Sequence, residues 1–244
     1  MLSKLAPEPD LVDRVHESLL DAILSGDMEP GRRYTQEALA ERLGVSRQPV
    51  LQALRLLRLQ GLIVDTANRR GICVAPLDAA FVTRLYQLRA ALDAAAARAA
   101  AHRPRADLRE AGDRIIEDGI AATEAGDLDR LVQTDLRFHS FIYEAADNPL
   151  LLETARQYWH HTRRAMTAYV RRAGQMSAVW AEHRAILDAI VAGDAPRAAE
   201  LSHDHASHSA QLLLGAGDYP GATASHNAEA GIRAGATTPR RKRA

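Results

Sequence analysis

Strand-forming residues are confined to one short stretch of this 244-residue chain, and this distribution most limits the folds open to it. Two β-rich runs, residues 62–64 and 72–75, flank a loop that ends at Gly71, a pattern typical of a hairpin. From Asp78 onward no segment has strand character, alanine is frequent, and aromatic residues make up only 5% of the chain. The sequence therefore predicts a mostly α-helical protein with one β-hairpin.

Ahead of the hairpin, the sequence predicts three helices. Apolar residues recur at helical spacing from Leu11 onward. Thr35 is a candidate N-cap for a second, short helix, and Ser46 is a candidate N-cap for a third helix over about residues 47–60. Helix, tight turn, helix and hairpin in this order predict an N-terminal winged helix-turn-helix domain over residues 1–76, with the hairpin as its wing.

The rest of the chain has the pattern of a helical bundle. Breaks that contain Gly or Pro separate its helical segments, and in two Ala-Gly-Asp turns the Gly ends one helix while the Asp caps the next. We predict an antiparallel, all-helical bundle of about six helices over residues 77–214. Residues 215–244 are rich in Gly and Ala and end in a basic run, so we predict a disordered tail.

The net charge of the whole chain does not indicate a binding partner, because 31 basic residues balance 31 acidic ones. The charge of one segment does. Residues 42–74 hold six arginines and one aspartate, a net charge of +5, which favours contact with phosphates. A solvated arginine-rich helix is the alternative. The single cysteine, Cys73, and the absence of an apolar run long enough to span a bilayer predict a cytoplasmic protein that does not enter a membrane.

The third predicted helix offers side chains suited to the edges of DNA bases. Arginine pairs with guanine and glutamine with adenine when they stand near the start of a helix in the major groove. The wing offers an arginine and a glycine for approach to the minor groove. The candidate DNA-binding residues are Thr35, Ser46, Arg47, Gln48, Gln52, Arg55, Arg70 and Gly71.

Three helices of the predicted bundle carry polar residues inside their apolar stripes. Asp135 and His139 lie four residues apart and so project from one helix face, while His183 and His205 lie in the stripes of two later helices. Burying these groups without partners is costly, so they must neutralise one another, form hydrogen bonds or hold an ion. Three imidazoles and one carboxylate suit Zn²⁺, Ni²⁺, Mn²⁺ or Fe²⁺; satisfied core histidines are the simpler alternative.

Residues 11–76 resemble the winged helix of the GntR family of bacterial transcription regulators. The resemblance rests on the pairs and runs LA, LGVSR, PV, AL and GL within the segment TQEALAERLGVSRQPVLQALRLLRLQGLI. It implies that Arg47 contacts DNA at the start of the recognition helix and that Gly71 is the wing-tip glycine. Relatives often carry arginine where this chain has Glu37 and Leu51, which implies an operator different from that of the best-known members.

Residues 78–214 resemble the FCD effector domain of the FadR-type branch of that family, in the segments DLRFHSFIYEAADNPLL, AEHRAILDAIVAGD and HDHASH. The resemblance implies a divalent metal, Zn²⁺ first, and a small organic acid as effector. The metal ligands that it implies are Asp135, His139, His183 and His205. Arg89 is the candidate to bind the effector carboxylate, and its alternative is a surface arginine or a pair with Asp93.

These features together predict a homodimeric, ligand-responsive transcriptional regulator that binds double-stranded DNA and is not an enzyme. A symmetric dimer implies a pseudo-palindromic operator. One alternative is a metal-dependent enzyme that acts on a small carboxylate through a metal-bound water, although the chain lacks an HExxH motif, a nucleophile elbow and a phosphate loop. Another is a structural or adaptor bundle in which the metal only adds stability.

Overall fold

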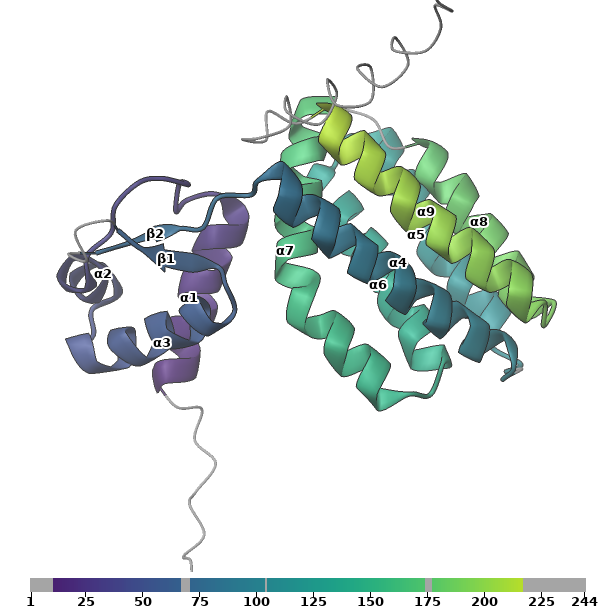
Figure 1. The fold of residues 1–244 in the computed structure, drawn as a ribbon, viewed down its shortest axis with the longest axis horizontal. Coiled ribbons are helices and arrows are strands. Elements are labelled where there is room, and N and C mark those ends of the chain that lie inside the picture. The colour runs from purple at the N-terminus through teal and green to yellow at the C-terminus, as the bar shows by residue number, and fades with distance from the viewer. Residues whose placement is uncertain (1–10, 67–70, 104, 174–176, 217–244) are drawn as a thin grey trace, which may run out of the picture. The chain divides into compact units, whose positions relative to one another are not determined.

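The computed structural model describes residues 11–66, 71–103, 105–173 and 177–216. Along these residues the order is three helices, a two-stranded hairpin and six further helices (Figure 1). The predicted fold class, a winged helix-turn-helix followed by a helical bundle, is confirmed. Contacts divide the chain at Pro76 into two compact units, with residues 159–164 grouped in the first.

The first unit builds its core from helices and hairpin together. Its helices are α1 (Leu11–Ser25), α2 (Gln36–Leu43) and α3 (Arg47–Leu59), and its strands are β1 (Ile63–Asp65) and β2 (Ile72–Val74). The strands pair antiparallel, with Ile63 opposite Val74 and Asp65 opposite Ile72. The core residues Val50 and Leu57 of α3 pack in one cluster with apolar residues of α1 and of both strands, so burial fixes which face of α3 stays exposed.

Local signals set the helix ends of this unit. Thr35 Oγ1 accepts a hydrogen bond from the backbone N–H of Ala38 at 3.3 Å, as its N-cap assignment predicts. Gly44 ends α2 with φ of 64°, a left-handed conformation that glycine adopts without strain. Ser46 is the N-cap residue of α3, as predicted, with the extended backbone of that position, but its side chain makes no capping hydrogen bond.

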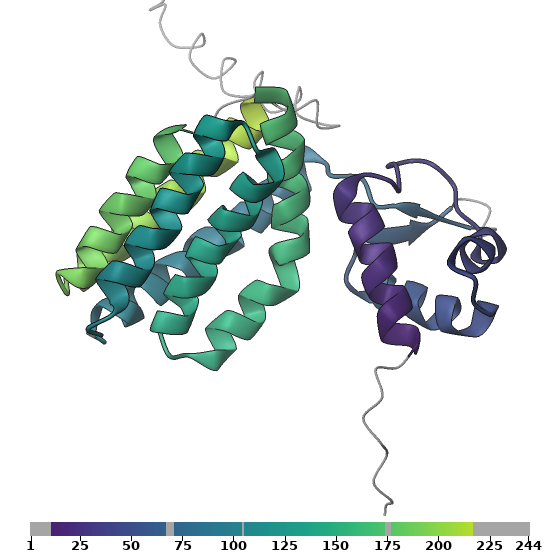
Figure 2. The ribbon, with the colours of Figure 1, turned by 180° about the vertical axis from the view of Figure 1, so that it is seen from behind.

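The second unit is all-helical in its described residues (Figure 2). Its helices are α4 (Ala79–Ala101), α5 (Leu108–Ala125), α6 (Leu128–Ala145), α7 (Pro149–Ala173), α8 (Ser177–Val191) and α9 (Ala195–Ala216). Helices α4 and α9 lie side by side (Figures 1 and 2). Buried alanines of α4, among them Ala96, Ala97 and Ala100, are small side chains that permit close helix packing.

The tight turns of the bundle have the predicted residues. Gly126 and Gly193 stand in the left-handed region, with φ of 65° and 71°. The aspartates that follow them then cap the next helix, because Asp127 accepts from the N–H of Arg130 at 3.1 Å and Asp194 does the same for α9. Short turns of this kind keep consecutive helices antiparallel.

Helix α9 includes the first two residues of the predicted tail, and the rest of that tail lies outside the described residues. Within the part of the chain that the structure describes, no helix combines the length and the apolar character that a membrane crossing requires.

Gly119 of α5 is a packing requirement, and its replacement gives a first prediction. A Cβ atom on Gly119 would overlap the indole ring of Trp180, which is buried and donates from Nε1 to Thr123 Oγ1 at 2.8 Å. We expect Gly119→Ala to lower the free energy of unfolding by about 1–3 kcal/mol in urea titrations, because overpacking outweighs the better helix propensity of alanine. The control is Gly215→Ala, where the added Cβ meets open space; equal effects of both variants would contradict the prediction.

Candidate metal centre and nucleic-acid interface

Four metal-ligating side chains meet inside the second unit. Helix α6 contributes Asp135 and His139, α8 contributes His183 and α9 contributes His205. All four side chains are buried, and one potential ligand atom from each lies within 4.8 Å of the others. The structure thus brings together the four residues predicted as a group from three separate stripes.

The spacing within this cluster suits a single cation. His183 Nε2 lies 3.3 Å from His205 Nε2 and 3.5 Å from Asp135 Oδ1. His139 Nε2 lies 3.8 Å from Asp135 Oδ2. Ligand atoms of a tetrahedral zinc site with bonds of about 2.0–2.1 Å lie roughly 3.3–3.4 Å apart. One ligand atom from each of the four residues lies within 4.8 Å of the others, so the four side chains would have to move closer together to share an ion.

Glu182 orients His205 from outside the cluster. His205 Nδ1 donates to Glu182 Oε2 at 2.7 Å, and His208 Nδ1 bonds the other oxygen, Oε1, at 2.8 Å. Burial of Glu182 raises the pKa of its carboxyl, but the two histidine hydrogen bonds outweigh this and the pKa is lowered. An ionised Glu182 fixes the proton of His205 on Nδ1 and leaves the Nε2 lone pair for the cluster.

A second buried carboxylate, Asp93 of α4, stands beside His139. Asp93 accepts from Tyr143 Oη at 2.7 Å and from Arg89 Nε at 3.2 Å, and its Oδ2 lies 3.5 Å from His139 Nδ1. A nitrogen of the Arg89 guanidinium lies 2.5 Å from His139 Nε2. Because a guanidinium only donates, Nε2 must accept, which again places the imidazole proton on Nδ1.

The charges of the cluster favour metal-binding forms of the histidines. Burial lowers the pKa of His139 and of His183 well below the ordinary value, and the charge of Arg89 adds to this effect, so both imidazoles are neutral as a metal requires. Burial raises the pKa of Asp135, and Arg89 opposes the shift. Asp135 Oδ2 and His183 Nδ1 are buried without a hydrogen-bond partner, and a cation would relieve the cost of the unpaired carboxylate oxygen. These residues therefore fit a divalent metal ion.

Arg89 joins the cluster to a small cavity. Its side chain is only 10% exposed and pairs with Asp93, while one guanidinium nitrogen lies 3.8 Å from Asp135 Oδ2. The pair with Asp93, which is the alternative to an effector-binding role, occurs, and Arg89 also lies beside the candidate metal ligands. The adjoining cavity has a volume of about 20 Å³ and is lined also by Met166 and Tyr169, which is room for about one water molecule.

The exposed face of α3 carries the other candidate residues. Arg47, Gln48, Gln52 and Arg55 are all exposed along this helix, and the opposite face is buried in the core of the first unit. Their charged and amide groups are therefore available to a ligand as a continuous row.

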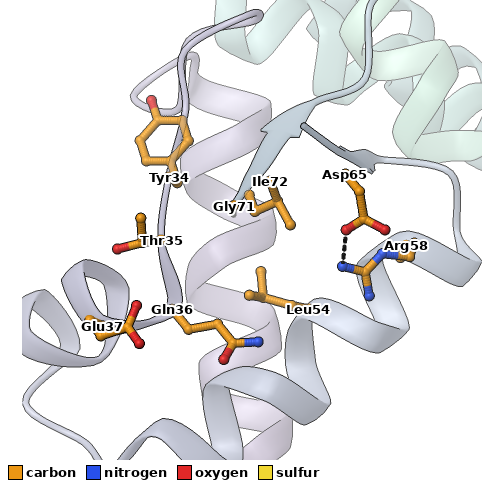
Figure 3. Close-up of a pocket in the computed structure, with 9 residues that line it drawn as sticks. All are labelled: Tyr34, Thr35, Gln36, Glu37, Leu54, Arg58, Asp65, Gly71 and Ile72. Atoms are coloured by element: carbon orange, nitrogen blue, oxygen red, sulfur yellow. Dashed lines mark hydrogen bonds and ion pairs between the residues drawn. The ribbon is translucent and has the colours of Figure 1, made fainter. Parts of the chain in front are cut away.

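A hollow of about 360 Å³ lies between the start of α2, helix α3 and the hairpin (Figure 3). Thr35 and Glu37 line it from the α2 side, and Gly71, which directly precedes β2, lines it from the hairpin. Arg58 of α3 and Asp65 of β1 both line the hollow and pair with each other at 2.7 Å. The two candidate residues Thr35 and Gly71, distant in sequence, thus meet around one polar hollow.

Two acidic residues pair with arginines of the basic segment, which the sequence did not indicate. Arg47 lies 3.0 Å from Glu37 of α2, and Arg58 pairs with Asp65. Both pairs are solvent-exposed, so each contributes little to stability. They lower the positive electrostatic potential around α3, because each carboxylate offsets part of the local positive charge.

The wing glycine has a structural reason that differs from the predicted one. The backbone N–H of Ile72 donates a hydrogen bond to the backbone oxygen of Tyr34, which brings the neighbouring Gly71 close to the same oxygen. A Cβ atom on Gly71 would lie only 2.6 Å from it. The glycine thus allows the wing to approach the chain ahead of α2. Arg70, the other candidate of the wing, lies outside the described residues.

A winged helix-turn-helix with an exposed Arg and Gln face, followed by a helical domain with a buried Asp and His cluster, defines a DNA-binding transcriptional regulator. The family described as "Bacterial regulatory proteins, gntR family" matches residues 11–74, and the FCD domain family matches residues 84–208. The chain belongs to the GntR family, in its FadR-type branch with an FCD domain. It is a regulator and not an enzyme, so the alternative of a metal-dependent enzyme is wrong.

Curated relatives share this class. A protein of Escherichia coli (strain K12) named as a regulator of the L-lactate dehydrogenase operon is 30% identical over 224 residues, which cover 81% of this chain and 84% of that protein. The Nta operon transcriptional regulator of Aminobacter aminovorans is 33% identical over 135 residues. That second match covers 54% of this chain and 62% of the relative, less than two thirds of its length.

Solved structures agree on the fold. McbR/YncC of E. coli has a TM-score of 0.71 at 21% identity, covering 88% of this chain and 99% of that one. A GntR regulator from Rhodococcus sp. RHA1 has a TM-score of 0.70 at 23% identity, covering 84% and 98%. At these identities the likeness concerns the fold.

Proposed function

We propose that this protein is a homodimeric transcriptional regulator whose affinity for an operator is controlled by a small organic acid, bound beside a divalent metal in the FCD domain. The observation that carries this proposal is the buried cluster of Asp135, His139, His183 and His205, with the cationic Arg89 in contact with it. A carboxylate effector needs a cation or a guanidinium as its partner; Arg89 is the guanidinium, and a metal ion bound by the cluster would be the cation.

The DNA-binding part of the proposal uses the exposed face of α3. A dimer places two such helices on two half-sites, which favours a pseudo-palindromic duplex. Arg47, Gln48, Gln52 and Arg55 would read base edges in the major groove, while Thr35, Ser46, Arg70 and Gly71 would contact the sugar-phosphate backbone or the minor groove. A regulator of chromosomal DNA acts in the cytoplasm.

The metal and Arg89 compete for one lone pair, which couples metal binding to effector binding. His139 Nε2 accepts from Arg89 at 2.5 Å, and one nitrogen lone pair cannot serve a guanidinium and a metal ion together. If Asp135 and the three histidines held an ion, Arg89 would be released from His139 and could donate its two parallel N–H groups to a carboxylate. The ion itself supplies positive charge that attracts the same carboxylate.

The cavity beside Arg89 explains how an effector could change the domain. Its volume of about 20 Å³ is far below the size of ordinary ligand sites. An organic acid must therefore displace lining side chains such as Met166 of α7 and Leu213 of α9. A shift of α7 or α9 is the kind of change that can alter a dimer and its grip on two half-sites.

Thermal unfolding of the full chain tests the proposal. Chelator-stripped protein is reloaded with Zn²⁺, Ni²⁺, Mn²⁺ or Fe²⁺ and screened against small organic acids, with L-lactate included because of the operon named for one relative. At an acid concentration about 100 times Kd, we expect Tm to rise by roughly 5–10 °C in metal-loaded protein and not in stripped protein. The same acid should change operator affinity by about 5–150-fold in gel-shift titrations.

Two other outcomes would favour the alternatives, a purely structural metal ion or no metal ion at all. If the metal raises Tm while every acid leaves both Tm and operator affinity unchanged, the ion only stabilises the bundle and the sensing role is wrong. If neither metal nor acid changes Tm, the four residues hold no ion and the proposal is wrong.

A further inference from the structure

Leu51 is an exposed apolar side chain of α3 that lies among arginines. Arg47, Leu51, Arg55 and Arg58 follow one another at intervals of four, four and three residues, so they form a row along one side of the helix. All four are exposed. Leu51 therefore lies inside a strip of positive charge, with an arginine one turn before it and another one turn after it.

Packing of the first unit does not account for a large apolar residue at this position. The buried side of α3 consists of other residues, for example Val50 and Leu54, which are at most 1% exposed. Leu51 is 44% exposed. A single exposed leucine is common on protein surfaces, so exposure alone does not indicate a binding role for Leu51. Its position between arginines does indicate a binding partner.

A partner of this surface must have many negative charges and also an apolar group that Leu51 can contact. The arginines on either side of Leu51 select phosphates or guanine edges. On the major-groove floor of DNA the apolar group is the 5-methyl of thymine, which is recognised by contact with aliphatic side chains. Leu51 stands one turn after Arg47, within the two N-terminal turns that contact bases in helix-turn-helix proteins.

We propose that Leu51 reads the 5-methyl group of a thymine in each operator half-site. This inference rests on the proposed function, because it requires α3 to enter the major groove. It makes Leu51 a specificity-determining residue, one that discriminates thymine from cytosine by an apolar contact, beside arginines that bind through charge and hydrogen bonds.

Removal of single methyl groups from the operator tests this directly. The probe is a duplex selected by the full-length protein from a random DNA pool, and each thymine in turn is replaced by deoxyuridine, which lacks only the methyl. At one thymine per half-site we expect the wild-type affinity to fall about fourfold, the equivalent of one buried methyl group. In Leu51→Ala the same replacement should change affinity by less than about 1.5-fold.

A matched control comes from the same helix. Leu59 is 77% exposed and is the last residue of α3, two turns beyond Leu51, so Leu59→Ala removes a comparable exposed side chain outside the two N-terminal turns of this helix. This variant should keep the full deoxyuridine penalty at the thymine that Leu51 reads. Circular dichroism checks that both variants retain the helical content of the wild type.

The outcomes distinguish this inference from the proposed function. If no thymine shows a penalty with the wild type, or if Leu51→Ala keeps the wild-type penalty, the methyl contact is wrong. If Arg47→Ala binds the selected duplex as well as the wild type does, α3 does not read the major groove and both proposals fail. Loss with Arg47→Ala together with an unchanged penalty in Leu51→Ala would overturn only the role of Leu51.

Discussion

Arg47→Ala is expected to lower operator affinity by at least about 30-fold. Arg47 begins α3 and is exposed, where an arginine can form two hydrogen bonds to one guanine. Each such contact contributes about 1–3 kcal/mol, and a dimer makes two. The variant also leaves Glu37, 3.0 Å away in the wild type, without its cationic partner near the phosphates, which adds to the loss.

Gel-shift titration at one fixed salt concentration measures this effect, because nonspecific binding changes steeply with salt. Arg47→Lys is the informative control. Lysine keeps the charge but not the planar fork, so it should restore nonspecific affinity while most of the specific affinity stays lost. Wild-type affinity for the selected duplex in Arg47→Ala would contradict a base-reading role for this residue.

His183→Ala is expected to lower metal affinity by more than about 100-fold. His183 is fully buried, stacks on Phe138 with ring centroids 4.1 Å apart, and directs Nε2 toward Asp135 and His205. Replacement of residues that merely orient metal ligands costs about 10–100-fold, so loss of a ligand should exceed that range. Calorimetric titration of chelator-stripped protein measures the affinity, and the metal-dependent rise in Tm should disappear with it.

Glu182→Gln serves as a graded companion to this variant. It keeps the shape of the side chain but removes the charge that holds His205 in the required tautomer, so we expect a loss of about 10–100-fold. His208→Ala is the matched control, because His208 bonds the other oxygen of Glu182 and is exposed. Wild-type metal affinity in His183→Ala would place any ion at a different site.

Local sequence signals predicted the element order and most helix ends. Thr35, Gly44 and Asp127 act within one turn of their own position, so their roles do not depend on distant contacts. Ser46 shows the limit of such signals, because the backbone takes the N-cap conformation without the side-chain hydrogen bond.

The candidate metal ligands were also visible in the sequence, because a polar residue inside an apolar stripe has few explanations. Their outer partners were harder to find. Glu182 directly precedes His183 and therefore lies on a different face of the helix. The apolar pattern that identified His183 does not predict a role for Glu182. The sequence indicated one partner of Asp93, because Asp93 lies four residues after Arg89. The contact of Asp93 with His139 depends on how α4 packs on α6.

The sequence by itself determined which segments are helical, which residues interrupt the apolar stripes, and where positive charge gathers. Helical periodicity repeats every 3.6 residues and is therefore readable along the chain. Only the tertiary structure decided that three helices bring Asp135, His139, His183 and His205 within 4.8 Å, and that Glu37 meets Arg47. Distances between helices follow from the packing of side chains across their interfaces, which no local pattern contains.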